Sequence, residues 1–158
     1  MMKLEYYDKW FRAKKSPVSP LAEEEAKKRH KEGDAYIALI SYSGEKHQVV
    51  DIADGWVSVL FLDKHKRCYL SYDFKKKNDE KLFLSKAIHC EFSDSSDNCS
   101  VSTTFIFEEN GSIYIERRNI NNGETVQKES FAETVDNWDL FPEFGNYTSL
   151  LRENRNTE

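Results

Sequence analysis

The chain has 158 residues, of which 13% are aromatic and only six are glycine and three proline, a composition that excludes a disordered or loop-rich protein. Its formal net charge of −5 argues against a nucleic-acid-binding protein. No apolar run approaches the about 18 residues that a membrane span needs. We therefore expect one domain over residues 1–153, with residues 154–158 frayed.

The three cysteines, Cys68, Cys90 and Cys99, contain no CxxC pair. Residues 1–15 hold neither the apolar segment nor the small-residue cleavage site of a signal peptide. Because disulfides are rare in reducing compartments, we interpret the cysteines as free thiols of a cytoplasmic protein.

The N-terminal part is predicted to contain the main helix. Residues 4–11 (LEYYDKWF) follow no clear periodicity, so we expect either a short strand or an aromatic plug. Ser19 and Pro20 predict the start of a helix over residues 20–32, as N-cap and first helical residue. Glutamates come first, Lys and Arg come last, and Gly33 ends the helix. Its thin apolar face suits a sheet edge.

Short apolar or alternating segments with short links follow, which favours antiparallel neighbours. The clearest pair, residues 56–62 and 67–74, is typical of a hairpin. The other predicted strands span residues 34–43, 48–52, 81–92, 99–109 and 112–118, with a weak strand at 124–129.

Three local signals refine these strands. Residues 43–45 predict a turn. Lys86 interrupts an apolar strand face, which predicts either a β-bulge or a strand that runs past the sheet margin there. Asn110-Gly111 predicts a two-residue hairpin turn.

The predicted fold class is α+β. It is a curled antiparallel β-meander of about seven strands, with one N-terminal helix (residues 20–32) and a short C-terminal helix (residues 146–153). The central strands are apolar on both faces, which the thin helix cannot cover. We expect the sheet to curl into a partial barrel and the C-terminal aromatic residues to fold back over it; a docked partner is the third possible cover.

The sequence carries no signature of catalysis, of a metal site or of a cofactor. The histidines His30, His47, His65 and His89 stand at no metal-binding spacing. The glycines form no phosphate-binding loop, and no nucleophile elbow is present. We therefore expect no enzyme activity and no cofactor.

Candidate partner-binding residues lie in the acidic C-terminal fifth and in the loop at residues 93–98. Residues 124–158 contain three Lys or Arg against eight Asp or Glu, and the carboxylates alternate with aromatic residues. This pattern predicts either an acidic interface with aromatic anchors for a basic protein, or aromatic residues that cap the core beside solubilising acids. The candidates are Asp94, Asp97, Asp136, Trp138, Asp139, Phe141, Glu143 and Tyr147.

In size, charge, expected compartment and sheet-rich organisation, the chain resembles the immunity proteins of bacterial polymorphic toxin systems, such as contact-dependent inhibition. The resemblance implies a one-to-one complex with a cognate toxin domain, often a basic nuclease, held over or beside its active site. From the net charge and the absence of a long apolar run, we expect neither a nucleic-acid nor a membrane partner. We expect the free protein to be a monomer or a weak dimer.

A small-molecule-binding protein is the second hypothesis. In it, the aromatic interior of a barrel-like meander encloses an apolar ligand. Bulky residues on the predicted strands, including Tyr36, Phe61 and Tyr72, favour a filled interior instead.

Overall fold

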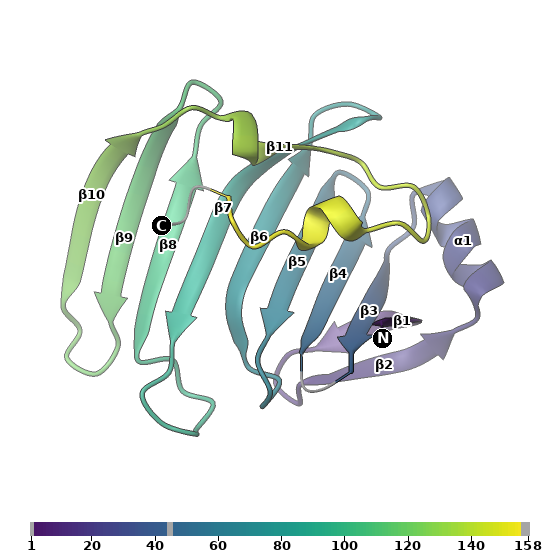
Figure 1. Cartoon of the computed structure of the whole chain (residues 1–158), viewed down its shortest axis with the longest axis horizontal. Coiled ribbons are helices and arrows are strands. Elements are labelled where there is room, and N and C mark those ends of the chain that lie inside the picture. Colours follow the sequence, from purple (N-terminus) through teal and green to yellow (C-terminus); the bar gives the residue numbers. More distant parts are fainter. Residues whose placement is uncertain (1, 44–45, 156–158) are drawn as a thin grey trace.

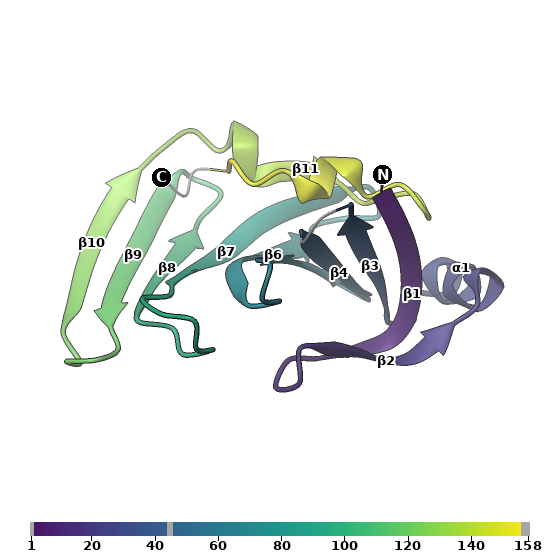
Figure 2. The same cartoon turned by 60° about the horizontal axis from the view of Figure 1, so that its bottom comes forward.

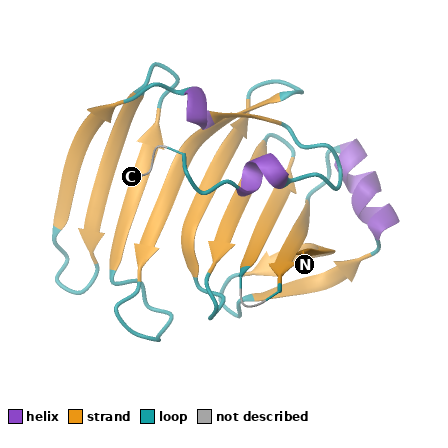
Figure 3. Ribbon diagram, in the orientation of Figure 1, coloured by secondary structure: helices purple, strands orange, loops and turns teal. Residues whose placement is uncertain are grey.

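The computed structural model describes residues 2–43 and 46–155, and its main feature is one antiparallel sheet of eleven strands (Figure 1). The strand order is β10-β9-β8-β7-β6-β5-β4-β3-β1-β2, and β11 pairs with β7 beside this path. Strands dominate the chain, as Figure 3 shows.

The central strands form a meander in which each strand pairs with the next. Their bounds are β3 (Tyr36–Tyr42), β4 (His47–Ala53), β5 (Trp56–Leu62), β6 (Cys68–Lys76), β7 (Lys81–Glu91), β8 (Val101–Phe107), β9 (Ser112–Asn119) and β10 (Thr125–Phe131). Each of these strands was predicted within a few residues, because the apolar alternation and the turn signals agree. Of the turn that the sequence predicts at residues 43–45, residues 44 and 45 lie outside the described residues.

The N-terminal residues form a β-hairpin, which the sequence did not predict. Strand β1 (Met2–Phe11) pairs with β3 through its first half and with β2 (Ser16–Leu21) through its second half. Both prolines of β2 are tolerated because this is an edge strand, where a missing N–H breaks no ladder.

The helix α1 (Glu23–Glu32) therefore begins three residues later than the predicted Pro20. Its N-cap is Ala22 rather than Ser19, whereas Gly33 closes it in the left-handed conformation as expected. Only Ala26 is buried, and the helix lies beside the β1 and β2 end of the sheet (Figure 1).

Two bulges reset which side chains share a face. In the pairing of β5 with β6, Tyr69 has no partner residue in β5. In the pairing of β6 with β7, Ser85 has no partner residue in β6, next to the predicted bulge at Lys86. A one-residue insertion moves every following side chain to the opposite face. Cys68 consequently lies on the opposite face from Leu70, contrary to the predicted alternation.

The C-terminal segment, residues 132–155, crosses one face of the sheet, and we name it the strap. It contains the 3-10 turn η1 (Val135–Asn137), the short strand β11 (Trp138–Leu140) and the 3-10 turn η2 (Thr148–Leu151). The predicted C-terminal helix at residues 146–153 is wrong, because only this one turn forms there.

The strap covers the main core. Tyr147 and Leu150 of the strap pack with buried residues of β3 to β8, such as Phe61, Tyr72 and Leu84. The opposite face carries a smaller cluster that includes Leu39, Val49, Leu60 and Leu62, packed against Tyr7 and Trp10 of the hairpin. Figure 2 shows the strap over one face and the β1–β2 hairpin beneath the other. We name these the strap face and the hairpin face.

The predicted fold class is corrected in three respects. The chain is mostly antiparallel sheet rather than α+β, it has eleven strands rather than about seven, and the sheet bends without closing into a barrel. Residues 2–21 and 138–140 supply the additional strands, which raise the strand number and the strand content. The sheet stays open because β10 and β2 remain separate edges. Of the segment predicted to fray, Arg155 is buried, whereas residues 156–158 lie outside the described residues.

Candidate functional site

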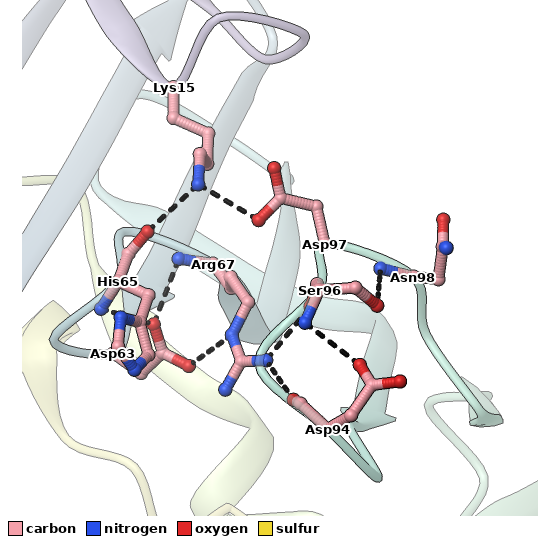
Figure 4. Close-up of polar contacts among 8 residues, drawn as sticks. All are labelled: Lys15, Asp63, His65, Arg67, Asp94, Ser96, Asp97 and Asn98. Carbon is pink, nitrogen blue, oxygen red and sulfur yellow. Dashed lines mark hydrogen bonds and ion pairs between the residues drawn. The ribbon is translucent and has the colours of Figure 1, made fainter.

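Three loops meet at one end of the sheet, and two cationic side chains tie them together (Figure 4). Arg67 follows the β5–β6 turn, and its guanidinium Nε lies 2.8 Å from the Asp63 carboxylate. Its Nη1 donates to the carbonyl oxygens of Asp94 and Ser96 in the β7–β8 loop, at 2.7 and 2.9 Å. The same guanidinium stacks 4.2 Å from the centre of the Phe92 ring. Arg67 thus holds both loops in place.

Lys15 brings the third loop, the tip of the β1–β2 hairpin, onto the same cluster. Its Nζ donates to the His65 carbonyl oxygen at 3.0 Å and to the Asp97 carboxylate at 2.8 Å (Figure 4). These contacts join residues 50 and 82 positions apart in the chain. A site built from three sequence-distant loops on a rigid sheet is the usual location of binding residues.

The local sequence explains why these loops keep their shape. The Asp63 carboxylate accepts the backbone N–H groups of His65 and Arg67, each at 2.9 Å, which closes an Asx-type turn. Burial alone would raise the pKa of Asp63, but these N–H groups and the Arg67 guanidinium hold it below its ordinary value. Asp63 is therefore charged at neutral pH and structural in role.

A half-open pocket of about 250 Å³ lies among these loops on the hairpin face. Its lining consists of apolar side chains, all three thiols and a predominantly basic rim: Trp10, Arg12, Ala13, Lys15, Leu60, Leu62, Lys66, Arg67, Cys68, Cys90, Phe92, Asp97 and Cys99. The bulges at Tyr69 and Ser85 turn Cys68 and Cys90 to the hairpin face, whereas uninterrupted alternation would place both on the strap face with Leu70 and Leu84. Among residues 2–43 and 46–155, no three His, Cys, Asp or Glu side chains are grouped to hold a metal ion.

The predicted partner-binding residues fall into two separate groups. Asp94 and Asp97 lie in the β7–β8 loop beside the pocket, whereas the other six lie on the strap (Figure 1). Asp97 binds Lys15, and Asp94 accepts the N–H of Ser96 at 2.8 Å. The two groups therefore do not form one surface.

Most of the strap candidates make internal contacts. Asp139 forms a buried ion pair with Arg155, and the Tyr147 hydroxyl lies 2.9 Å from that of Tyr36. Trp138 packs on Phe83, with the ring centres 4.9 Å apart. These contacts anchor the strap to the sheet.

The remaining strap candidates are more accessible. Lys76 lies 4.3 Å above the Phe141 ring, and Glu143 is exposed. Asp136 pairs weakly with Arg152 at 3.6 Å and accepts Arg155 through its carbonyl oxygen at 3.1 Å. Among the predicted strap carboxylates, Asp136 and Glu143 are thus the two that a partner can reach.

A second candidate site, the free edge of β10, was not among the predicted residues. Every residue of β10 is exposed, and within the described chain no strand other than β9 pairs with it. Val126 and Phe131 are 64% and 72% exposed. The weak strand predicted at residues 124–129 was the available signal, because a strand covered on neither face has no reason to alternate between apolar and polar residues.

Comparison of the chain with protein-family models, with curated proteins and with solved structures finds no match. Within residues 2–43 and 46–155, no helix has the length and apolar character required to cross a membrane.

Proposed function

We propose that this protein is a stoichiometric protein-binding module that docks a partner on the free edge of β10 and the uncovered sheet beside it. The observation that carries the proposal is the complete exposure of a seven-residue edge strand in a sheet whose central strands are covered. A partner strand added to such an edge gains backbone hydrogen bonds along its length.

The hydrogen-bond pattern identifies the backbone groups that a partner would use. At the two ends of β10, the Ala132 N–H donates to the Gly111 carbonyl and the Asn119 N–H donates to the Glu124 carbonyl. Bonds alternate along an antiparallel pair, so the even-numbered residues of β10 face β9. The outward N–H and C=O groups belong to Thr125, Gln127, Glu129 and Phe131.

The chemistry of this region favours a basic protein as the partner. Residues 108–133 contain six glutamates against three Lys or Arg, a formal charge of −3, and they also carry the exposed Val126 and Phe131. Apolar side chains surrounded by carboxylates combine hot-spot burial with electrostatic steering of a cation-rich partner. In the immunity-protein hypothesis, this partner is a cognate toxin domain such as a basic nuclease.

The small-molecule barrel hypothesis loses its basis in this fold. The sheet is not closed, and the residues that would line the interior, including Phe61, Tyr72 and Phe74, are fully buried in a packed core.

The test is native mass spectrometry of the tagged protein recovered from its source cells, with two β10 variants. Gln127→Pro removes an outward N–H and blocks strand addition without breaking the β9 ladder. Gln127→Ala keeps that N–H and serves as the matched control. We expect a one-to-one complex with the wild type and Gln127→Ala, and at least about tenfold weaker binding with Gln127→Pro.

Equal binding by both variants would exclude the edge as the docking site. If the captured protein is encoded beside this gene and is toxic, co-expression with the wild type should restore growth, and Gln127→Pro should not. Charge reversal at Asp136 and Glu143 then tests steering, whereas reversal at Asp139 would unfold the strap because that side chain is buried against Arg155.

A further inference from the structure

We propose that the half-open pocket on the hairpin face is a binding site for a small amphipathic anion, with its apolar body against the thiol-lined floor and its anionic head at the Arg12 and Lys66 rim. This site is separate from the β10 edge and does not depend on the proposed partner binding.

The floor of the pocket is apolar and suited to a hydrocarbon or aromatic body. Leu60 and Leu62 from β5 are buried beneath it, and Trp10 and Phe92 form its walls. An apolar cavity of about 150 Å³ accepts benzene, so a volume of 250 Å³ corresponds to a ligand of about ten non-hydrogen atoms.

Two of the three thiols extend this apolar surface because they are neutral. Burial raises the pKa of the Cys68 thiol. Burial, together with a hydrogen bond to the Cys99 thiol, raises the pKa of Cys90 to about 12. A neutral thiol behaves as a small hydrophobic group. Cys68 and Cys90 therefore contribute no anionic sulfur that would repel an anion.

The rim has the opposite charge to the protein as a whole. The lining includes four cationic side chains and one carboxylate, a formal charge of +3 in a protein of net charge −5. Lys15 is already paired with Asp97. Arg67 is already bonded to Asp63 and to carbonyl oxygens of the β7–β8 loop.

Arg12 and Lys66 are the cations that remain for a ligand. Within residues 2–43 and 46–155, neither side chain makes a hydrogen bond or an ion pair. The Arg12 charge acts only at longer range, on Asp51 and Cys68. Charge-assisted hydrogen bonds from such groups are the ordinary means of holding a carboxylate or phosphate.

Backbone strain is concentrated at the same rim. The described residues other than glycine with positive φ are Lys15, Ser19 and Lys66, and two of these three line the pocket, at φ 50° and 60°. Left-handed backbone at residues with long side chains has an energetic cost and recurs at binding sites. Here it places two lysines beside the pocket.

The test uses octanoate, which has an anionic head and ten non-hydrogen atoms, with octan-1-ol and acetate as the body-only and head-only probes. Binding to the full chain is measured by calorimetry. Its location is read from mass spectrometry of iodoacetamide labelling at Cys68, Cys90 and Cys99. The variant is the double substitution Arg12→Gln/Lys66→Gln, and Lys14→Gln is the matched control, because Lys14 lies on the same hairpin tip but outside the lining.

We expect octanoate to bind with a dissociation constant below about 1 mM and to slow labelling of the thiols by at least about threefold. The wild type should bind octan-1-ol and acetate at least about tenfold more weakly than octanoate. The double variant should bind octanoate at least about tenfold more weakly than the wild type does, and Lys14→Gln should bind it as tightly as the wild type. Octanol binding as tight as octanoate binding, an unaffected double variant, or unprotected thiols at saturating octanoate would each overturn the proposal.

Discussion

The middle of the sheet and its β10 edge differ in the number of layers that cover them. In β5, five of seven residues are buried, because the strap packs on one face and the β1–β2 hairpin on the other. In β10, all seven residues are exposed, although the strand is fully paired with β9 along one edge. Strand pairing alone therefore gives a strand no characteristic sequence pattern; the covering layers give it one.

Charged side chains also have different roles in the covered half and in the open half of the sheet. In the covered half, charged groups are part of the structure, as in the Arg155–Asp139 pair and the Arg67–Asp63 pair. In the open half, the glutamates of residues 108–133 lie on a surface that little else covers. Substitutions of strand side chains should consequently affect stability in the covered half and binding in the open half.

The largest expected effect comes from Asp139→Ala in the strap. The Arg155 side chain is 0% exposed, stacks 5.0 Å from the Phe74 ring and would be left as an unpaired buried charge. Breaking a buried pair in this way costs about 3–5 kcal/mol. We expect the free energy of unfolding in urea to fall by this amount.

The control for Asp139→Ala is the double variant Asp139→Leu/Arg155→Met, which replaces both charges by apolar groups and should recover most of the lost stability. A loss below about 1 kcal/mol in Asp139→Ala would mean that the pair does not fasten the strap.

The next largest effect is expected at Gly111, where the β8–β9 turn meets the start of the strap. A Cβ there would lie 2.7 Å from the Ala132 carbonyl oxygen, and φ is +98°. The left-handed backbone costs about 1–2 kcal/mol for alanine, and the overpacking adds about 1–3 kcal/mol. Gly111→Ala should therefore lower the free energy of unfolding by about 2–5 kcal/mol.

Gly123→Ala isolates the backbone part of this effect, because φ is +74° there and no atom lies within 4 Å of the added methyl group. We expect the smaller loss of about 1–2 kcal/mol. Equal losses in the two variants would show that the strap can move away from Gly111.

A matched pair of substitutions compares the two halves of the sheet directly. Val59 in β5 is fully buried and Val126 in β10 is 64% exposed. Val59→Thr buries a hydroxyl group and should cost about 1–3 kcal/mol, whereas Val126→Thr should stay within about 0.5 kcal/mol of the wild type. Chemical denaturation of both variants measures the contrast, and similar losses would contradict it.

The smallest predicted effect is a pH dependence from His30. Burial, and to a lesser extent Lys76, lowers its pKa in the folded protein, where its Nδ1 lies 2.7 Å from the Tyr36 hydroxyl. As the pH falls below the unfolded value of about 6.5, the unfolded chain takes up this proton first. The contribution of neutral His30 to the free energy of unfolding is therefore fully present above about pH 6.5. It is lost as the pH falls from there towards the lower pKa of the folded protein.

Urea midpoints at pH 7.5 and 5.5 test this sign. The wild type should lose more stability on acidification than His30→Gln, because the variant has no proton to take up at this position. An equal loss in both proteins would assign the acid sensitivity to other groups.

The sequence was sufficient to predict those elements for which local preferences and tertiary packing favour the same structure. The central hairpin, the bulge beside Lys86 and the Gly33 cap were predicted and are present. The Asn110-Gly111 turn also forms, but the Glu108 N–H to Ser112 carbonyl bond closes a loop one residue longer than predicted.

The failures came from elements whose structure depends on distant residues. Residues 16–21 contain two prolines and become a strand only because β1 supplies a partner. The strap has no periodicity, because its side chains fill gaps in a core set by β3 to β8. The thiol pocket depends on two bulges, of which the sequence signalled only the one beside Lys86.

The strap has a consequence for synthesis on the ribosome. Strands β3 to β10 pair with their sequence neighbours, so the meander can form as the chain emerges. The strap follows every strand that it covers, and Phe61, Tyr72 and Leu84 stay uncovered until residues 132–155 leave the exit tunnel. The nascent chain therefore presents a broad apolar sheet for most of its synthesis, which is the kind of surface that chaperones bind.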